Sequence, residues 1–379
     1  MASPITAGSV CVSGAAATTC CGTGVEAFCS RVAGLSDPSL PRSGASAPET
    51  ISISLQLRRS PRLLDADRLT AQVLAAVDHD LGTFLRELSD QEREHVGVAL
   101  GSAYGHLSNY LAYLKTGTEH GYQLVNPRLF PTTLSNWSAV SVSDAYSLFG
   151  SSTPINSGLS AGLEAIAYAA QAIRDGEEQS MIAGGYDELT PYNARVLEAS
   201  TATGCVGPRL QAHKGKVRPG EGVGLLLLQS FDAAKHSNRK PLAEYGATVI
   251  LHDMCPETPH AVARAAEAVT TAVVESGLRL NDIAAVFPSA SGSPAAEQLE
   301  VQLLRELFGA RLSALDILPI KTVTGECFAA SGPLQCVAAV EYLAHTTSPQ
   351  LLSDRTGVLI SALGYDGTYA ATVFTRSPA

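Results

Sequence analysis

Apolar residues recur at helical spacing through the middle of the chain and predict one amphipathic helix with a single buried stripe. The positions of this stripe are Leu159, Leu163, Ile166, Ala167, Ala170 and Ile173. A short extended stretch over 154–156 and a turn at Ser157-Gly158 precede the helix, and Asp175-Gly176 ends it. The run 179–185 then predicts a buried strand. A side chain at the turn would lie beside the helix N-terminus, where backbone N–H groups and the helix dipole favour negative charge.

The same patterns predict alternating strands and helices along the rest of the chain. The expected strands are 5–13, 96–101, 225–228, 283–287, 318–320 and 357–361, and the expected helices are 22–32, 65–88, 105–114, 259–276, 297–308 and 332–344. This alternation predicts an α/β fold with largely parallel sheets. One sequence pattern occurs twice. Pro154-Ile155 is followed by a helix and then by Gly185-Tyr186-Asp187, and Pro319-Ile320 is followed by a helix and then by Gly364-Tyr365-Asp366. This repeat indicates duplicated halves.

Composition narrows the class of protein. The 379 residues exceed one simple core and suggest two domains or two fused halves. With 45% hydrophobic and 16% charged residues the chain should fold, and a net charge of −10 argues against nucleic acid as a partner. The longest apolar run, 223–228, is far too short to span a membrane. The first thirty residues lack a basic segment before an apolar one, so we interpret them as strand and loop and expect a cytoplasmic protein.

Eight cysteines occur without any CxxC pair, so we expect reduced, mostly buried thiols. The nine histidines show no metal-binding spacing, and no metal is expected. Residues 220–224 are rich in glycine but precede a strand rather than a helix, so we expect no bound nucleotide and no other cofactor.

Longer motifs give a resemblance. Asn126-Pro-Arg-Leu-Phe-Pro131, Pro219-Gly-Glu-Gly-Val-Gly224 and Leu363-Gly-Tyr-Asp-Gly-Thr368, together with Val25-Glu-Ala-Phe28, make nearly the whole chain similar to the β-ketoacyl synthases of fatty acid and polyketide assembly. That resemblance implies a thiolase-type fold, an αβαβα five-layer sandwich of two similar halves. We place these halves at 1–240 and 241–379.

Three catalytic groups of that family are replaced in this chain. The resemblance places Leu159 where the family has its Cys nucleophile. It places Ser289, in Pro288-Ser-Ala-Ser-Gly-Ser-Pro294, and Glu326, in Lys321-Thr-Val-Thr-Gly-Glu326, where the family has its two His; Lys321 is retained. Leucine has no nucleophilic atom, and an ionised glutamate would oppose a developing enolate by like-charge repulsion. We therefore expect no condensing activity from this chain alone.

The pattern is more similar to one branch, the chain length factors of type II polyketide synthases. The similarity lies in segments 160–165, 297–300 and 319–325. It implies a heterodimer with an active ketosynthase subunit, an acyl carrier protein that carries the polyketide chain, and an acyl channel at the shared interface. The channel and interface positions that it implies are Tyr104, Ser108, Leu111 and Ala112. Many chain length factors carry Gln at the position of Leu159, linked to malonyl decarboxylation, and Leu159 departs from that pattern.

Several positions keep a plainer interpretation beside the functional one. Leu159 is either core packing or a wall of the former acyl site, and Leu111 and Ala112 are either channel or helix core. Ser289 and Glu326 are either neutral replacements at abandoned catalytic positions or residues that make structural hydrogen bonds. Lys321 is expected to form an ion pair with Glu326 or Glu300. Cys327 has no activating neighbour in sequence.

The basic cluster Arg58, Arg59, Arg62 and Arg68 is either a solvated face or a docking patch for an acidic carrier protein. As a whole function, the alternatives are a decarboxylase or an acyltransferase that uses Ser157 or Ser160, and a homodimer that only binds acyl chains.

Overall fold

The computed structural model describes residues 9–33, 67–196, 218–253, 258–289, 294–345, 356–364 and 366–377. Within them an eleven-stranded sheet runs in the order β4-β3-β5-β6-β1-β7-β11-β10-β8-β9, with β2 paired to β1. The strands are β1 (Val10–Thr19), β2 (Gly22–Thr23), β3 (Val96–Gly101), β4 (Ser152–Ile155), β5 (Ser180–Asp187), β6 (Gly222–Ser230), β7 (Ala243–His252), β8 (Ile283–Phe287), β9 (Asp316–Ile317), β10 (Gly357–Leu363) and β11 (Thr368–Thr375).

The strand order contains the same arrangement twice. One half runs β4-β3-β5-β6-β1 and the other β9-β8-β10-β11-β7, and β1 and β7 meet antiparallel at Val10–Val12 and Ala243–Tyr245. In each half the first three strands are parallel and the next two pairings are antiparallel. The duplication indicated by the repeated Pro-Ile and Gly-Tyr-Asp segments is therefore confirmed as a repeat of topology. The division at residue 240 stays a prediction.

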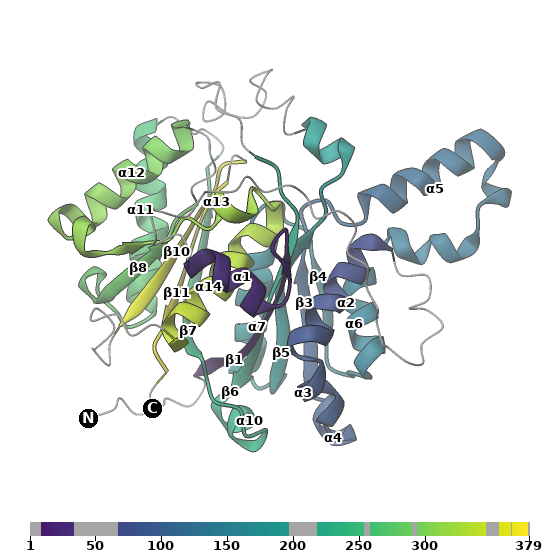
Figure 1. Cartoon of the computed structure of the whole chain (residues 1–379), viewed down its shortest axis with the longest axis horizontal. Helices are drawn as coiled ribbons and strands as arrows, with labels where there is room; N and C mark the ends of the chain where they lie inside the picture. The colour runs from purple at the N-terminus through teal and green to yellow at the C-terminus, as the bar shows by residue number, and fades with distance from the viewer. Residues whose placement is uncertain are drawn as a thin grey trace.

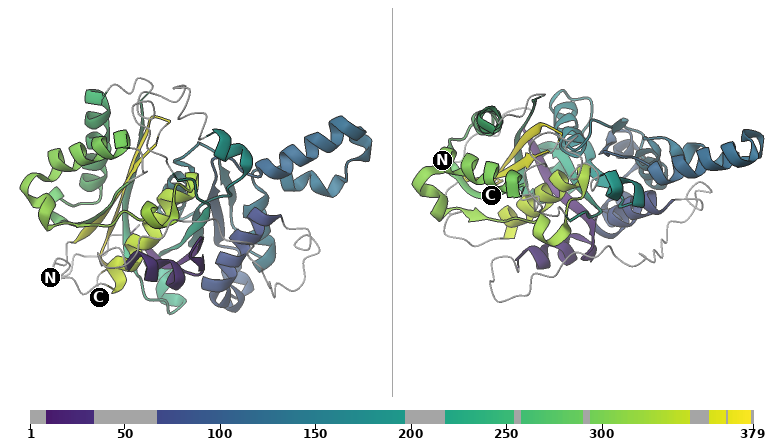
Figure 2. Two further views of the ribbon diagram at one scale, coloured as in Figure 1. Left: turned by 45° about the horizontal axis from the view of Figure 1, so that its top comes forward. Right: turned by 90° about the horizontal axis from the view of Figure 1, so that it is seen from above.

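Helices form three layers around these strands (Figures 1 and 2). The helices are α1 (Val25–Ala33), α2 (Arg68–Asp80), α3 (Gly82–Glu87), α4 (Asp90–Arg93), α5 (Leu107–His120), α6 (Trp137–Tyr146), α7 (Ala161–Arg174), α10 (Phe231–His236), α11 (Thr258–Glu275), α12 (Pro294–Phe308), α13 (Lys321–Thr324) and α14 (Ser331–His345). Short 3₁₀ turns occur at η3 (Tyr122–Leu124), η4 (Pro127–Leu129), η5 (Pro131–Thr133), η6 (Leu280–Asp282), η7 (Gly309–Ala314) and η8 (Phe328–Ala330).

Three apolar clusters separate the layers, as the thiolase-type αβαβα sandwich requires. One packs α2 and α6 on the outer face of the first half, one surrounds α7 and α14 in the centre, and one packs α11 and α12 on the outer face of the second half. Alternation along β6 divides its side chains, since Leu225 and Leu227 face the first cluster whereas Leu226 and Leu228 face the central one. The fold class predicted from the sequence is confirmed.

Helix α5 projects from this body as an arm, and the turns η3–η5 return beside it (Figures 1 and 2). Of its 14 residues only Gly117 is buried. The returning segment exposes Tyr122, Leu124, Leu129 and Phe130 by 54%, 68%, 40% and 52%. A helix whose apolar residues find no core in its own chain is typical of an interface.

Some sequence predictions of single elements were wrong. The sheet is mixed rather than largely parallel, because antiparallel strands β6, β1, β7 and β11 occupy its middle. The strand expected at 318–320 is two residues earlier, at Asp316–Ile317, and the first strand is Val10–Thr19 rather than 5–13. Residues 1–8, and Arg58, Arg59 and Arg62 of the basic cluster, lie outside the described residues. No described helix is long and apolar enough to cross a membrane.

Candidate functional site

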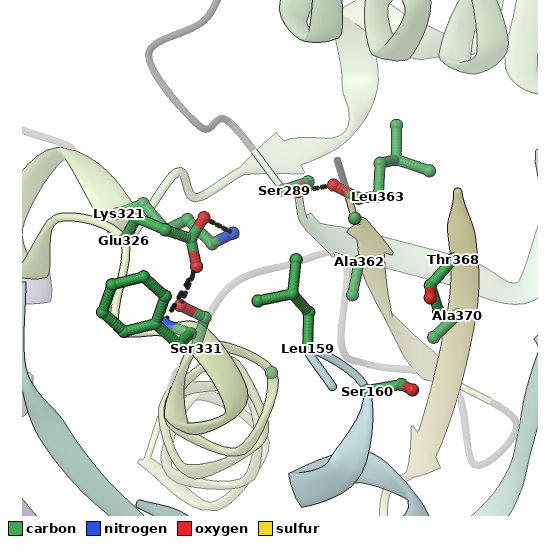
Figure 3. Close-up of a pocket in the computed structure, with 13 residues that line it drawn as sticks. Leu159, Ser160, Ser289, Lys321, Glu326, Ser331, Ala362, Leu363, Thr368 and Ala370 are labelled. Carbon is green, nitrogen blue, oxygen red and sulfur yellow. Dashed lines mark hydrogen bonds and ion pairs between the residues drawn. The ribbon is translucent and has the colours of Figure 1, made fainter. Parts of the chain in front are cut away.

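A small pocket lies at the N-terminus of α7, between the η8 turn and the ends of β10 and β11 (Figure 3). Its lining is Leu159, Ser160, Ser289, Lys321, Glu326, Phe328, Ser331, Gly332, Ala362, Leu363, Gly364, Thr368 and Ala370. All four positions that the sequence assigned to the former catalytic centre, Leu159, Ser289, Lys321 and Glu326, thus meet around one space. The space left among them is about 20 Å³, little more than one water molecule needs.

Leu159 points into the middle of this pocket (Figure 3). Gly158 (φ 90°) makes the turn that delivers it, two residues before α7 begins. The isobutyl group of Leu159 packs against Phe328 and fills the middle of the pocket. It also lacks a nucleophilic atom. The neighbouring Ser160 points away from it, and the Ser160 hydroxyl donates to Glu164 Oε1 at 2.6 Å.

Glu326 is held by three donors from one side of the pocket. Its Oε2 accepts from Lys321 Nζ at 2.8 Å, and its Oε1 accepts from Ser331 Oγ at 2.7 Å and from the Phe328 N–H at 3.1 Å. Lys321 and Glu326 are both buried. Of the two partners that the sequence left open for Lys321, the structure selects Glu326. A buried ion pair is tolerated when its remaining lone pairs are satisfied in this way.

Ser289 is engaged on the opposite side. Its hydroxyl donates to the Leu363 carbonyl at 3.3 Å, and its N–H donates to Glu300 Oε1 at 2.6 Å. Glu300 therefore binds the Ser289 segment, while Lys321 is bound by Glu326. Both the hydroxyl and the N–H of Ser289 thus have partners within their own chain.

Phe328 forms the remaining wall and is a residue that the sequence analysis missed. It is buried and has φ 53°, in the left-handed region that a bulky residue rarely adopts. The turn that contains it packs tightly, because a Cβ on Gly162 or Gly185 would lie 2.3 or 2.4 Å from the Ala329 carbonyl oxygen. Only glycine at these two positions allows so close an approach of η8 to α7 and β5.

Asp187, at the end of β5, ties the η8 turn to the base of the arm. Its carboxylate accepts from Ser102 Oγ (2.6 Å) and from the N–H groups of Ala103 (3.0 Å), Tyr104 (3.1 Å) and Ala329 (2.9 Å). Complete burial raises the pKa of Asp187 to about 6, although the four hydrogen bonds oppose that rise. The local signal for this role is an acidic residue two positions beyond the predicted strand 179–185.

The four predicted channel positions have different surroundings. Tyr104 packs on Phe328, and the Ser108 hydroxyl is a hydrogen-bond partner of Glu188, a carboxyl whose pKa is raised mainly by burial. Leu111 is half-buried and Ala112 is exposed, so neither is core within this chain. Tyr104 therefore touches a lining residue of the pocket directly, and whether the four line a channel stays a prediction.

The structure also bears on the interpretations of Arg68 and Cys327. Arg68 is not a freely solvated charge, because it pairs with Glu188 (3.7 Å) and with the buried Glu221. Burial raises the pKa of the Cys327 thiol, which agrees with the expectation that nothing activates it. Among the described residues no group of three His, Cys, Asp or Glu side chains could hold a metal ion.

The fold and this pocket define the class of protein: a thiolase-type sandwich whose central pocket lies at the N-terminus of α7. Two family models match the chain, the β-ketoacyl synthase N-terminal domain over residues 56–234 and the β-ketoacyl synthase C-terminal domain over residues 244–353. The chain belongs to the β-ketoacyl synthase family.

Its similarity to characterised relatives is distant. A 3-oxoacyl-[acyl-carrier-protein] synthase 2 of Coxiella burnetii is 26% identical over 289 residues, 70% of this chain and 67% of that protein. The mitochondrial 3-oxoacyl-[acyl-carrier-protein] synthase of Arabidopsis thaliana is 24% identical over 285 residues, 70% of this chain but only 60% of that protein. The match thus spans two thirds or less of these relatives.

Solved structures with the same fold cover nearly the whole chain. The ishigamide ketosynthase/chain length factor superposes with a TM-score of 0.77 at 22% identity, covering 98% of this chain and all of the other. A type II polyketide synthase acyl-carrier protein in complex with its ketosynthase has a match with a TM-score of 0.75 at 19% identity, covering 97% and 99%. At these identities the likeness concerns the fold.

Proposed function

We propose that this chain is a chain length factor, a β-ketoacyl synthase-like subunit that does not condense acyl units itself. It pairs with an active ketosynthase and shapes the channel that receives the growing polyketide. The observation that carries this proposal is the pocket at α7, where Leu159 occupies the centre while Glu326 and Ser289 are engaged by their own chain.

The chemistry of condensation explains why this observation matters. The reaction requires a thiolate that takes the acyl chain and two imidazoles that stabilise the enolate and move protons. None of the described residues that line the pocket is a Cys or a His. Lys321 does not compensate, because its ammonium group is paired with Glu326.

The exposed apolar residues of the arm favour a function that involves a partner chain. Helix α5 and the turns η3–η5 expose apolar side chains that only another polypeptide of complementary shape would bury. The base of the arm is joined to the pocket through Tyr104 and Phe328. A channel between the two subunits would therefore run from the partner's cysteine along the Tyr104 side of this chain, and an acyl carrier protein would deliver the chain to it.

A second candidate is an acyltransferase or decarboxylase of altered chemistry, and one observation bears on it. Ser160 has a carboxylate partner, Glu164, at 2.6 Å. Ser160 is 2% exposed, however, and its side chain points away from Leu159. A serine without an imidazole base lacks the usual activation, so we prefer the non-catalytic subunit.

Co-expression with a ketosynthase that keeps its Cys and both His tests the proposal. We expect a 1:1 complex by light scattering, elongation of malonyl units by the complex, and none by this chain alone. Replacing the partner's cysteine by alanine should abolish all elongation. Elongation by the isolated chain, or a covalent acyl adduct on Ser160 found by mass spectrometry, would contradict it, and a stable homodimer that ignores the partner would favour a protein that only binds acyl chains.

A further inference from the structure

The arm, formed by α5 and the turns η3–η5, is braced within itself. The ring of Tyr122 lies over Gly117, where a Cβ would come within 2.3 Å of that ring. Tyr113 packs against Tyr122 and Phe130, with ring centroids 6.3 and 6.0 Å apart. Helix and returning turns therefore form one unit, and the direction of this unit depends on the contacts at its base.

His106 is a buried side chain at that base. It immediately precedes α5 and is 3% exposed, whereas along α5 only Gly117 is buried. The imidazole lies between two helices of the body. Its Nδ1 is 3.2 Å from Asp67 Oδ2, at the N-terminus of α2, and its Nε2 is 3.2 Å from Ser138 Oγ, on α6. Figure 1 shows α5 leaving the body beside these two helices, and His106 connects the arm to both.

The partners of His106 are themselves held in place. Asp67 caps α2, because its carboxylate accepts from the Thr70 N–H at 2.8 Å and from the Thr70 hydroxyl at 3.2 Å. Ser138 Oγ lies 3.2 Å from Thr70 Oγ1. Both contacts of the imidazole thus lead to groups that are tied to α2, so a movement of the ring would break these contacts rather than carry the partners along.

Asp67, His106 and Ser138 have the composition of a catalytic triad but not its access. Ser138 and the His106 ring are completely buried, and neither lines the pocket at α7. The Nδ1 of His106 also lacks the alignment of a hydrogen bond with Asp67, so that contact is electrostatic. A triad needs an aligned pair and a serine that a substrate can reach. The cluster is therefore suited to hold the ring and not to catalyse.

Charge strengthens this hold. Burial alone would raise the pKa of Asp67, but His106 and the Thr70 donors keep that pKa below its ordinary value. The charge of His106 also acts on Glu188, a carboxyl whose pKa is raised mainly by burial. Arg68 is a second cation beside Glu188, at 3.7 Å. Removing the imidazole would thus take a cation away from two largely buried carboxyl groups.

We propose that His106 is a positioning residue, which fixes the direction of the arm against the body and so presents the arm to the partner chain. Helix α5 has 14 residues and is about 21 Å long, so a tilt of about 10° at His106 moves its far end by about 4 Å. Interfaces require close packing, and a displacement of this size would separate their contacts. The direction of the arm is a property of the isolated chain, whereas its use in binding a partner rests on the proposed function.

A distance between the arm and the body tests the direction of the arm. Spin labels on non-natural residues in place of Glu119, near the end of α5, and Asp90, on α4, avoid the cysteines, and both sites are exposed. Pulsed electron–electron resonance should give one narrow distance distribution for the labelled chain. His106→Ala should broaden it or move its centre by about 3 Å or more, and Ser138→Ala should do so to a smaller extent.

His79→Ala is the matched control. His79 also pairs with a carboxylate, that of Asp80 at 2.8 Å, but lies at the other end of α2 from Asp67. It should leave the distance distribution unchanged. Urea unfolding establishes which variants fold, and Ser138→Ala removes only one hydroxyl. An unchanged distribution in His106→Ala, or in Ser138→Ala if only that variant folds, would overturn the proposal.

Assembly tests the use of the arm. In sedimentation of the chain with a ketosynthase over a dilution series, His106→Ala should weaken association by about tenfold, whereas His79→Ala should not change it. A displaced arm that assembles with unchanged affinity would overturn the link to the partner. Failure of the wild-type chain to bind a ketosynthase would contradict the proposed function and with it this link, while the spin-label distances still decide whether His106 fixes the arm.

Discussion

The ring of Tyr104 stands edge-on to the ring of Phe328, with centroids 5.0 Å apart and an interplanar angle of 82°. This geometry is favourable for an aromatic pair. Phe328 also packs on Leu159 and gives its N–H to Glu326, while the Tyr104 N–H binds Asp187. Through this pair, the pocket at α7 and the base of the arm form one connected structure.

The backbone of Phe328 gives the first prediction. Removing its buried ring should cost about 3 kcal/mol or more in the free energy of unfolding. Because its φ is 53°, Phe328→Gly should be less destabilising than Phe328→Ala by roughly 1 kcal/mol. Urea unfolding measures both. At the buried strand residue Phe287 the order should reverse, with glycine worse than alanine, and the same order at both positions would contradict strain at Phe328.

The Lys321–Glu326 ion pair gives the second prediction. Removing one partner of a buried ion pair leaves an uncompensated charge, so Glu326→Leu and Lys321→Met should each cost about 3–5 kcal/mol. The double variant Lys321→Met/Glu326→Leu should cost clearly less than the sum of the single changes, since both charges are then gone. A double-mutant cycle from urea unfolding checks this. Strict additivity would show that the two side chains do not depend on each other.

Much of the fold could be predicted from the sequence because its signals are local. The helical stripe from Leu159 to Ile173 and the apolar runs of β3, β6 and β8 appear within a few residues of where they were expected. The middle of the sheet could not be predicted, since the antiparallel pairing of β7 and β11 joins residues more than a hundred positions apart.

The site shows the same division. Leu159, Ser289, Lys321 and Glu326 were found because family motifs mark their positions. The structural roles of Phe328 and Asp187 were not predicted, because they come from a left-handed backbone angle and from loops that meet only in the folded chain. The ion pairs of the exposed Arg68 were not predicted for a related reason. Its partner Glu221 is 153 residues away.

Asp187 gives a prediction of pH dependence. Its pKa is about 6 in the folded chain against an ordinary 3.8, so between these values the folded state holds a proton that the unfolded state has lost. Its contribution to stability is therefore largest at low pH and is lost as the pH rises to 6, by on the order of 3 kcal/mol.

The asparagine variant isolates this contribution. The difference in unfolding free energy between the wild-type chain and Asp187→Asn, measured in urea at pH 4.5 and pH 7, should shift against the wild type at the higher pH. Asparagine also presents N–H groups to backbone donors, so the variant should be less stable than the wild type throughout. The exposed Asp90→Asn is the control. A difference independent of pH would contradict a raised pKa at Asp187.

The arm gives the last prediction. Leu124 and Phe130 are 68% and 52% exposed, so Leu124→Asp/Phe130→Asp should change the stability of the isolated chain by little. In the proposed complex the same two side chains would be buried against the ketosynthase, and charges there should weaken association by about 100-fold or more. Sedimentation or light scattering of the co-expressed pair measures this. Val274→Asp is the matched control, because Val274 is 71% exposed but lies on α11, on the opposite outer layer. If both variants assemble equally well, the arm is not the interface, and the exposed apolar residues of η3–η5 need another explanation.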